Sequence, residues 1–334
     1  MLETLEEYSV LALYSAMVVY SLAFVFYAVD LANRSGDSSA ALANGGARKP
    51  AASTATGAAG GGTTTLVRPA VGSAGSGTVR TAPRSRALRI GFSLTVLGFL
   101  FHLAATILRG IAAERVPFAN MYEFALTATL SIVGIFLLVQ FFVDLRFLGA
   151  LVTGLAVLFL GLTKINFYVS IVPLMPALDS YWLVIHILVA VLAVGFLTLS
   201  FGLSVLQLLQ TRRENFAGSG PGTMSFLGGL PDSNRLEDFA YRMAIIGFVF
   251  WSFTLIAGSI WAEAAWSRYW GWDTKEVWTL VIWVLYAGFI HARATRGWRG
   301  TRSAWLSIVA YAAVIFNFAI VNVFFKGLHA YSGL

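Results

Sequence analysis

The chain of 334 residues contains no cysteine, little charge and only four histidines. Without cysteine the protein can form no disulfide and offers no thiolate ligand or thiol nucleophile, so any sulfur chemistry must come from a substrate or a partner. Charged residues make up only 12% of the chain, against about 25% in an ordinary globular domain. Together with a hydrophobic fraction of 58%, this shortage excludes a soluble enzyme and a disordered regulator.

The hydrophobic residues are concentrated in runs of about 20, the length that crosses the hydrocarbon core of a bilayer. Long runs without two-residue alternation predict helices rather than a β-barrel. The sequence therefore predicts an all-α polytopic integral membrane protein, a bundle of about eight transmembrane helices. The predicted spans cover residues 9–30, 90–110, 122–143, 147–163, 181–209, 238–259, 276–292 and 303–324.

The distribution of Lys and Arg predicts which side each loop occupies, because basic loops stay cytoplasmic. With the N-terminus outside, the inner segments hold seventeen of these residues and the outer segments hold six. We therefore expect a multi-pass protein of the plasma (inner) membrane with both termini on the extracytoplasmic side. The net charge of +7 is then explained by the basic residues that set the orientation in the membrane, and no nucleic-acid partner is expected. Glu3, Glu6 and Glu7 at the start argue against a cleaved signal peptide.

The chain divides into a first span at 1–31, a low-complexity stretch at 32–88 and a membrane domain at 90–334. The stretch at 32–88 is built from Ala, Gly, Ser and Thr with scattered Arg. Such a segment buries too little apolar surface to fold, which predicts a disordered cytoplasmic loop. The inner loop at 210–237 is expected to be a second flexible link.

Six of the ten tryptophans fall between positions 261 and 283, in a segment that the orientation places in an outer loop at 260–278. An aromatic belt at the membrane surface explains one or two tryptophans at a helix end, but not four within residues 261–272 followed by acidic residues. The pattern favours a flat, electron-rich platform for a large planar ligand. The candidate residues are Trp261, Trp266, Trp270, Trp272, Asp273 and Trp278.

Two of the four histidines, His186 and His329, are expected to flank the tryptophans at a similar height on the outer face. Imidazoles from two separate segments commonly hold haem iron, so the pattern favours a pair of axial ligands over two isolated boundary residues. His291 and His102 fall inside predicted spans, where ionisable groups are functional candidates. Their depths in the membrane differ by roughly 10 Å at the rise of an α-helix, so the sequence does not establish that the two histidines bind one iron. For His102 a hydrogen-bonded histidine within the bundle remains an equal alternative.

These residues resemble the CcsA-type (also CcsB or ResC) cytochrome c biogenesis proteins of the System II pathway. The segment Trp261–Trp278 is similar to the tryptophan-rich "WWD" signature of that family. Residues 117–123 resemble its first outer loop, and residues 172–178 precede the expected histidine. Residues 327–331 are similar to its C-terminal histidine segment. The resemblance covers about residues 90–334 and leaves out the Ala/Gly-rich loop.

The resemblance implies the haem-handling subunit of a holocytochrome c synthase, a cytochrome c haem-lyase, that binds haem b. His186 and His329 would be outer axial ligands of the haem iron, the tryptophan segment would hold the haem plane, and His291 would serve an intramembrane haem site. The second intramembrane ligand can come from a ResB-like membrane partner, which leaves His102 a doubtful ligand. The implied activity joins haem vinyl groups to the thiols of the Cys-X-X-Cys-His segment of apocytochrome c. Proteins that keep those thiols reduced would be further partners.

Two rivals belong to other classes. A haem or small-solute transporter without covalent chemistry would show polar paths and broken spans, of which the sequence has few signs. A respiratory subunit that binds haem for electron transfer would place its histidines on facing helices at matched depths. No side chain is assigned here as a catalytic acid or base.

Overall fold

The computed structural model describes residues 2–45, 85–216, 225–295, 297–325 and 327–328. Within these ranges the chain is helical, and eight helices are long and apolar enough to cross a membrane. They run at Glu3–Asn33, Arg86–Ala112, Met121–Val139, Arg146–Asn166, Tyr181–Phe216, Ser233–Trp266, Thr274–Ala294 and Thr301–Phe324. The predicted all-α bundle of eight spans is therefore confirmed, with boundaries that differ by a few residues.

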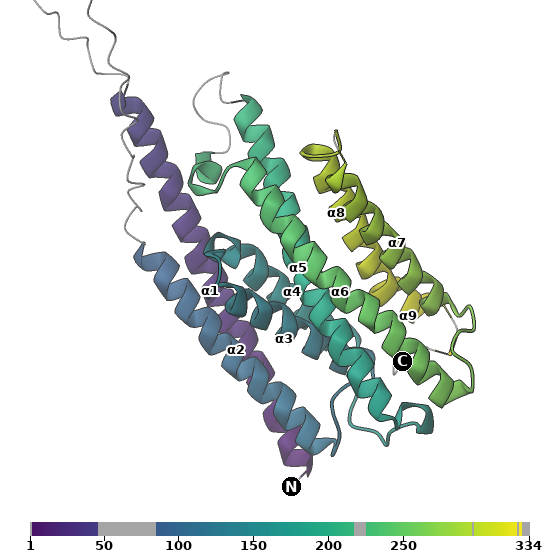
Figure 1. Cartoon of the computed structure of the whole chain (residues 1–334). Helices are drawn as coiled ribbons and strands as arrows, with labels where there is room; N and C mark the ends of the chain where they lie inside the picture. The colour runs from purple at the N-terminus through teal and green to yellow at the C-terminus, as the bar shows by residue number, and fades with distance from the viewer. Residues whose placement is uncertain (1, 46–84, 217–224, 296, 326, 329–334) are drawn as a thin grey trace, which may run out of the picture.

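The elements that matter for the site are numbered along the chain (Figure 1). They are α1 (Leu2–Gly45), α2 (Arg86–Ala112), α3 (Met121–Val139), α4 (Gly149–Asn166), α5 (Tyr181–Phe216), α6 (Ser233–Trp266), α7 (Thr274–Ala294), α8 (Thr301–Phe316) and α9 (Asn322–Phe324). Short 3-10 turns lie at Arg146–Leu148, Pro176–Leu178 and Ser225–Gly229, and a π-helical turn at Asn317–Val321 joins α8 to α9.

The first helix is longer than the apolar run alone predicts. α1 continues to Gly45, which corrects the start of the loop expected at 32–88, while residues 46–84 of that loop lie outside the described residues. Alanines at positions 40, 41 and 43 favour this extension, because alanine has the highest helix propensity and adding a residue to an existing helix needs no new nucleus.

Polar N-cap residues set where several helices begin. The side chain of Asn120 accepts a hydrogen bond from the backbone N–H of Glu123 at the start of α3, and Asp232 does the same for Arg235 in α6. Each cap satisfies one of the four N–H groups that a helix start leaves without a partner. The predicted starts were late by only one to five residues for these two helices, because the apolar run begins after the cap.

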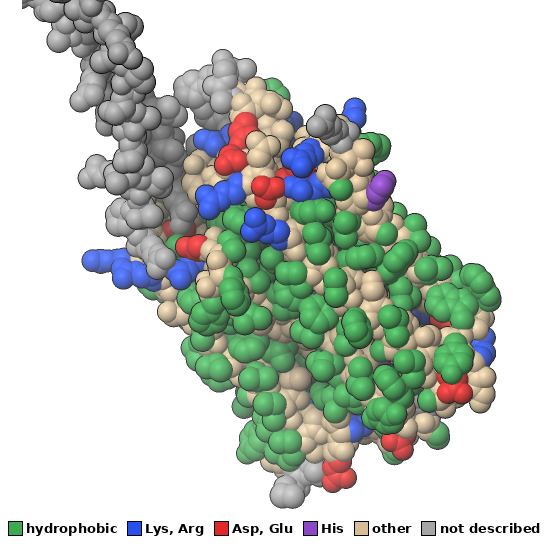
Figure 2. All heavy atoms as spheres, in the orientation of Figure 1, with side chains coloured by type: hydrophobic (Ala, Val, Ile, Leu, Met, Phe, Trp, Pro, Cys, Tyr) green, Lys and Arg blue, Asp and Glu red, His purple; other side chains and the backbone are tan. Residues whose placement is uncertain are grey.

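The helices pack in two groups that share α5 and α6 (Figure 1). One apolar core joins α1 to α6 and includes the buried side chains of Tyr20, Phe136 and Leu148. A second core joins α5, α6, α7 and α8 around Trp251 and Tyr286. Figure 2 shows the outside of the bundle as a broad hydrophobic belt with Lys, Arg, Asp and Glu gathered beyond it, as expected for a surface that faces lipid.

The bundle has two distinct ends. The connections α2 to α3, α4 to α5 and α6 to α7 lie at one end, called the tryptophan end. The connections α3 to α4, α5 to α6 and α7 to α8 lie at the other, called the arginine end. The Glu6–Arg109 ion pair places the start of α1 at the tryptophan end, and the Lys275–Asn322 hydrogen bond places the end of the eighth span there too.

Candidate haem site at the tryptophan end

A cavity of about 350 Å³ opens between helices near the tryptophan end. Its walls come from α3, α4, α5, α6, the start of α7 and the end of α8, so side chains far apart in the sequence meet there. Most of the lining is apolar, with Phe124, Ile187 and Trp251 as examples. A volume of this size within a helical bundle is typical of a small-molecule or cofactor site.

His186 lines this cavity from α5 and is half-buried. Its Nδ1 lies 3.0 Å from the backbone carbonyl oxygen of Thr254 in α6. A carbonyl only accepts, so Nδ1 carries the proton, and Nε2 is then the nitrogen with the lone pair that a metal needs. The same arrangement, with the second ring nitrogen held by a carbonyl, fixes the tautomer and orientation of histidine ligands at metal sites.

Two further residues, Trp261 and Gly258, define the place of the imidazole. The indole of Trp261, only 2% exposed, stacks on the His186 ring with centroids 5.9 Å apart and an angle of 18° between the planes. Gly258 of α6 lies directly against the same imidazole, because a Cβ added there would lie 2.8 Å from Cε1 and 2.9 Å from Nδ1 of His186. The close approach of α5 and α6 at this level therefore requires a glycine.

The tryptophan segment is not one outer loop. Trp261 and Trp266 belong to the last turns of α6, residues 267–273 form the connection, and Trp278 lies in α7. The apolar run of α6 simply continues through Trp266. The helix ends at Trp266 and is followed by its C-cap Ser267, which has a left-handed backbone (φ 55°), and Trp272 is left-handed as well (φ 58°).

The indoles also do not form one flat platform. Trp266 meets Trp261 edge to face at 4.9 Å, and Trp270 meets Trp272 at 5.9 Å with planes 89° apart. Trp278 packs against Phe316 of α8 at 4.3 Å. Of the six clustered tryptophans, Trp261 and Trp270 line the cavity. Edge-to-face pairs are the favoured geometry of neighbouring aromatic rings, so the segment builds a folded aromatic wall rather than a plane.

Asp273 and Glu276 are structural parts of this wall. Asp273 caps α7, while Glu276 Oε2 accepts hydrogen bonds from the N–H groups of Gly271 at 2.8 Å and Asp273 at 3.0 Å, a complete capping box. Asp273 Oδ1 also accepts a hydrogen bond from the N–H of Leu328 at 3.2 Å. His329 lies outside the described residues, but its neighbour Leu328 is thus held beside the tryptophan segment.

The other two histidines lie outside the cavity. His291 is exposed on α7 near the arginine end. His102 on α2 is completely buried, with Nδ1 3.4 Å from the Tyr20 hydroxyl and Nε2 3.0 Å from the carbonyl oxygen of Leu126. Nε2 therefore donates and Nδ1 accepts, so both ring nitrogens are engaged in holding α1, α2 and α3 together. This geometry matches the alternative of a hydrogen-bonded bundle histidine.

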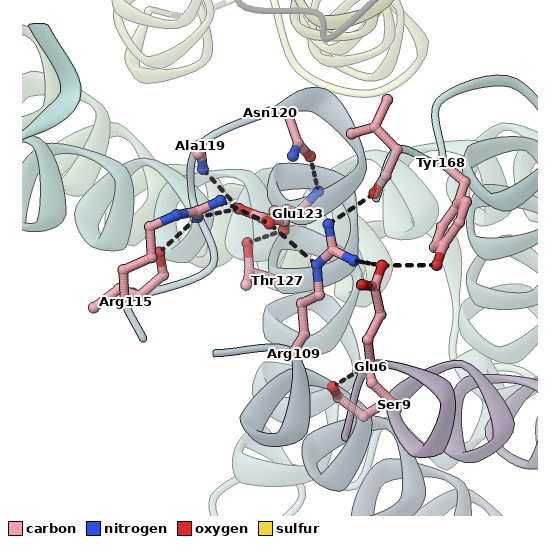
Figure 3. Close-up of polar contacts among 12 residues, drawn as sticks. Glu6, Ser9, Arg109, Arg115, Ala119, Asn120, Glu123, Thr127 and Tyr168 are labelled. Atoms are coloured by element: carbon pink, nitrogen blue, oxygen red, sulfur yellow. Dashed lines mark hydrogen bonds and ion pairs between the residues drawn. The ribbon is translucent and has the colours of Figure 1, made fainter. Parts of the chain in front are cut away.

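A buried ionic network joins α1, α2 and α3 next to the cavity wall (Figure 3). Glu123, with 0% of its side chain exposed, pairs with Arg109 Nε at 3.1 Å and Arg115 Nη1 at 2.7 Å, and accepts the N–H of Ala119 at 2.9 Å. Arg109 also pairs with Glu6 of α1 at 2.7 Å. Because Ala119 and Asn120 line the cavity, Glu123 fixes part of its wall.

Tyr168 connects this network to the segment after α4. Its hydroxyl donates to Glu6 Oε1 at 2.9 Å, and the ammonium of Lys164 lies 3.0 Å from the centre of its ring. Burial raises the pKa of the Tyr168 phenol above its usual range, and the bonded Glu6 carboxylate raises it further. The phenol therefore stays neutral and able to donate well into alkaline solution.

Sequence reasoning missed several residues of the site. The sequence does not mark Gly258 or Thr254, since Gly258 acts through a missing Cβ and Thr254 through its backbone carbonyl rather than through its hydroxyl. Lys275, Asn317 and Asn322 also line the cavity. Lys275 was visible only as part of the tryptophan motif, and polar residues near the end of the eighth span could have pointed to Asn317 and Asn322.

The fold and the cavity define a polytopic helical membrane protein with a histidine in an aromatic-walled cavity at one end. The chain belongs to the Cytochrome C assembly protein family, which it matches over residues 94–329. It is 32% identical over 263 residues to the cytochrome c biogenesis protein CcsA of Synechococcus elongatus, covering 67% of this chain and 81% of the relative. The CcsA of Trieres chinensis is 31% identical over 252 residues, covering 68% and 81%.

A solved structure shares the fold. The cytochrome c heme lyase CcmF superimposes with a TM-score of 0.61 over 94% of this chain, at 15% sequence identity. The chain spans 46% of the length of CcmF. At this identity the likeness concerns the arrangement of helices alone.

Proposed function

We propose that the chain is the haem-handling subunit of a System II cytochrome c synthase, which holds haem b at the tryptophan end and presents its vinyl groups to apocytochrome c. The observation that carries this proposal is His186, oriented by Thr254 and Trp261 inside a cavity of about 350 Å³. Haem is the substrate here. The apolar lining suits its macrocycle and the lone pair on Nε2 suits its iron.

His329 is the proposed second axial ligand of the outer haem. The hydrogen bond from Leu328 to Asp273 supports this role, because it brings the preceding residue to the tryptophan segment. In the proposed site Trp261 and Trp270 line the cavity, Trp266 and Trp272 support them edge to face, and Trp278 anchors α7 against α8. Asp273 and Glu276 shape the connection and are assigned no acid or base role.

The chain contributes to the reaction by position. Each thioether forms when a thiol S–H adds across a vinyl C=C bond: sulfur bonds to one vinyl carbon, hydrogen goes to the other, and no net oxidation occurs. The absence of cysteine fits this division, because the Cys-X-X-Cys-His segment of the substrate supplies both thiols. The protein then needs to orient haem and exclude competing reactants. The haem-lyase activity is proposed for a complex with a ResB-like membrane partner.

His291 is proposed to bind haem at a second, intramembrane site reached from the cytoplasm. Its exposure on α7 supports a site completed by another chain, since a second ligand from a ResB-like partner could meet it there. In this proposal the tryptophan end faces the extracytoplasmic side, the arginine end faces the cytoplasm, and haem passes between the two. Proteins that keep the substrate thiols reduced would act upstream.

The direct test replaces His186 by glycine in the full chain, purified together with its partner. We expect loss of the haem absorption that the site at His186 contributes and loss of cytochrome c yield, with recovery of both when imidazole is added. His102→Gln is the matched control, because it alters a histidine outside the cavity; haem per folded protein should stay unchanged. Normal haem content and cytochrome c yield in His186→Gly would contradict the ligand assignment.

The same preparation separates a synthase from a haem or solute transporter. On addition of reduced apocytochrome c, a synthase passes its haem to the substrate in covalent linkage. A transporter without covalent chemistry would release haem that organic solvent still extracts from the cytochrome. Extractable haem only would therefore overturn the proposed activity while leaving haem binding intact.

A further inference from the structure

The cavity has one polar corner, formed by Lys275 and Glu276 of α7, Asn317 of the π-helical turn and Asn322 of α9. The rest of the lining is mainly apolar. A ligand of this corner must therefore match the donors and acceptors that these four side chains leave without a partner.

Two buried acceptor oxygens of the corner point to a ligand. Asn317 is 5% exposed and Glu276 is 8% exposed, and within the described ranges neither Asn317 Oδ1 nor Glu276 Oε1 has a hydrogen-bond partner. The other carboxylate oxygen, Glu276 Oε2, accepts the N–H groups of Gly271 and Asp273. Buried polar atoms are normally bonded, and an exception calls for an explanation such as a bound group. The corner thus offers two acceptors to a ligand that donates.

The charges of the corner favour a neutral ligand. The ammonium of Lys275 bonds Asn322 Oδ1 and lies in the field of the Asp273 carboxylate, while Glu276 adds a second carboxylate. The ammonium repels a cation, and the two carboxylates repel an anion. The class of ligand that fits is therefore an uncharged group with N–H or O–H donors.

Of the two substrates of the proposed function, haem does not belong to this class. Its edges are hydrocarbon or carboxylate, and carboxylates only accept hydrogen bonds. Apocytochrome c, by contrast, brings one N–H donor with nearly every residue of its backbone. Because its thiols must reach the vinyl groups, the backbone that carries them lies beside haem, in the cavity that also holds His186.

We propose that the polar corner is a subsite for the peptide backbone of the cysteine-containing segment, whose N–H groups donate to Glu276 Oε1 and Asn317 Oδ1; the identity of the peptide rests on the proposed function. Each peptide unit also carries a carbonyl. Lys275 suits it, since its ammonium can donate three hydrogen bonds and finds one acceptor among the described residues. Main-chain hydrogen bonds provide affinity without reading side chains, so segments of different sequence can be held alike.

The test uses the full chain purified with its partner and a fluorescent synthetic peptide with a Ser-X-X-Ser-His core. Serine in place of cysteine prevents covalent attachment, and fluorescence anisotropy measures binding. A series of analogues replaces one backbone amide at a time by an ester, which removes a single N–H and adds no bulk. We expect the ester to weaken binding about tenfold at one or two positions, the effect of losing a hydrogen bond to a buried acceptor.

Three variants assign the sensitive positions. Asn317→Leu removes one acceptor, and Glu276→Gln keeps an oxygen for the capping box while turning an amide NH2 toward the cavity. In each of them one sensitive position should lose its ester penalty and the other should keep it. Asn166→Leu is the matched control, because Asn166 is exposed on α4 and lies outside the cavity lining. Its penalties should equal those of the wild type.

A wild type without any sensitive position would overturn the peptide subsite. Ester penalties that are the same in the wild type, Asn317→Leu and Glu276→Gln would overturn it as well, because water rather than peptide would then satisfy the two oxygens. If Asn317→Leu does not fold, Glu276→Gln decides by the same comparison. Failure of the proposed function appears elsewhere, as a haem spectrum that does not depend on His186, since the peptide probe contains no haem.

Discussion

At the scale of single residues, the position of the candidate ligand His186 depends on the absence of a Cβ at Gly258. The His186 ring occupies the space that a side chain at Gly258 would need, with distances of 2.8 and 2.9 Å from the added Cβ to two ring atoms. Real Cβ atoms essentially never approach so closely, and α6 cannot retreat without disturbing Trp261, which stacks on the same ring. The imidazole must therefore move when Gly258 is substituted.

We expect Gly258→Ala to lower the haem affinity of the site at His186 about tenfold, because a small misplacement of a ligand or reacting group is costly. The measurement is the haem absorption per protein. Gly288→Ala in α7 is the matched control, since none of the described atoms lies within 4 Å of its added Cβ. Both changes raise helix propensity equally. An equal haem content in the two variants would contradict the placement of His186.

The hydrogen bond from Tyr168 to Glu6 should make the stability of the ionic network depend on pH. Its folded pKa is raised by burial and by the Glu6 carboxylate, so the neutral phenol is favoured in the folded state. A group with a raised folded pKa contributes stability that is complete below the unfolded pKa, about 10 for tyrosine, and is lost as the pH rises through the folded pKa.

The wild type should therefore melt above Tyr168→Phe at pH 8, and the difference should shrink as the pH rises beyond about 10. The apparent melting temperature in detergent at several pH values measures this gap, and subtraction cancels the other tyrosines. Tyr269→Phe, at an exposed position of the tryptophan segment, should produce no such trend. A gap that stays constant to pH 12 would show that the hydroxyl of Tyr168 is not bonded to Glu6.

At the scale of helices, the network around Glu123 fastens elements that are distant in sequence. Arg109 of α2 joins Glu6 of α1 to Glu123 of α3, and its Nη2 donates to the carbonyl of Val169 after α4 at 2.8 Å. In hydrocarbon there is little hydrophobic force between helices, so polar contacts of this kind contribute to which helices associate. The network lies at the tryptophan end, where it also positions the loop before α3.

Removing the charge of Glu123 should be strongly destabilising, because it leaves two buried guanidinium groups without their shared carboxylate. We expect Glu123→Gln to lower the free energy of unfolding by about 3 kcal/mol. The measurement is thermal unfolding in detergent. Glu114→Gln, an exposed acid in the same turn region, should stay within about 0.5 kcal/mol of the wild type. Similar losses in both variants would argue against a special role for the network.

The spans could be predicted because each is a continuous apolar run, a property of neighbouring residues. The network could not, because Glu6, Arg109 and Glu123 lie on three different helices and nothing in one sequence says which helices touch. The same limit explains why Lys275 and Asn317 were missed as a pair, although each was readable as polar. His186 and Trp261 were predicted as site residues because histidine is scarce in the chain and the tryptophans are clustered, but their stacking depends on the crossing of α5 and α6.

At the scale of the whole molecule, the orientation in the membrane remains our proposal from the charge distribution. The two ends are chemically different, with the tryptophan segment at one and most of the arginines of the connections at the other. The positive-inside rule then places the arginine end in the cytoplasm.

The cysteine-free chain makes this orientation easy to measure. We expect Asp179→Cys, at the tryptophan end, to react with a membrane-impermeant maleimide in intact cells, and Arg299→Cys, at the arginine end, to react only after the membrane is opened. Both positions are exposed. Because the wild type has no cysteine, it should not react with the maleimide and serves as the negative control. The reverse pattern of labelling would invert the proposed direction of haem handling.

The connection between α6 and α7 carries conformational strain. Ser267 and Trp272 both adopt left-handed backbone angles, which cost a residue with a side chain roughly 1–2 kcal/mol each. Glycine would remove that cost at either position, yet the sequence keeps a serine and a tryptophan. Contacts around the connection must offset this cost, and the capping box of Asp273 and Glu276 together with the hydrogen bond from Leu328 to Asp273 are such contacts. The connection beside the cavity is therefore held in its shape by its neighbours rather than by its own backbone preference.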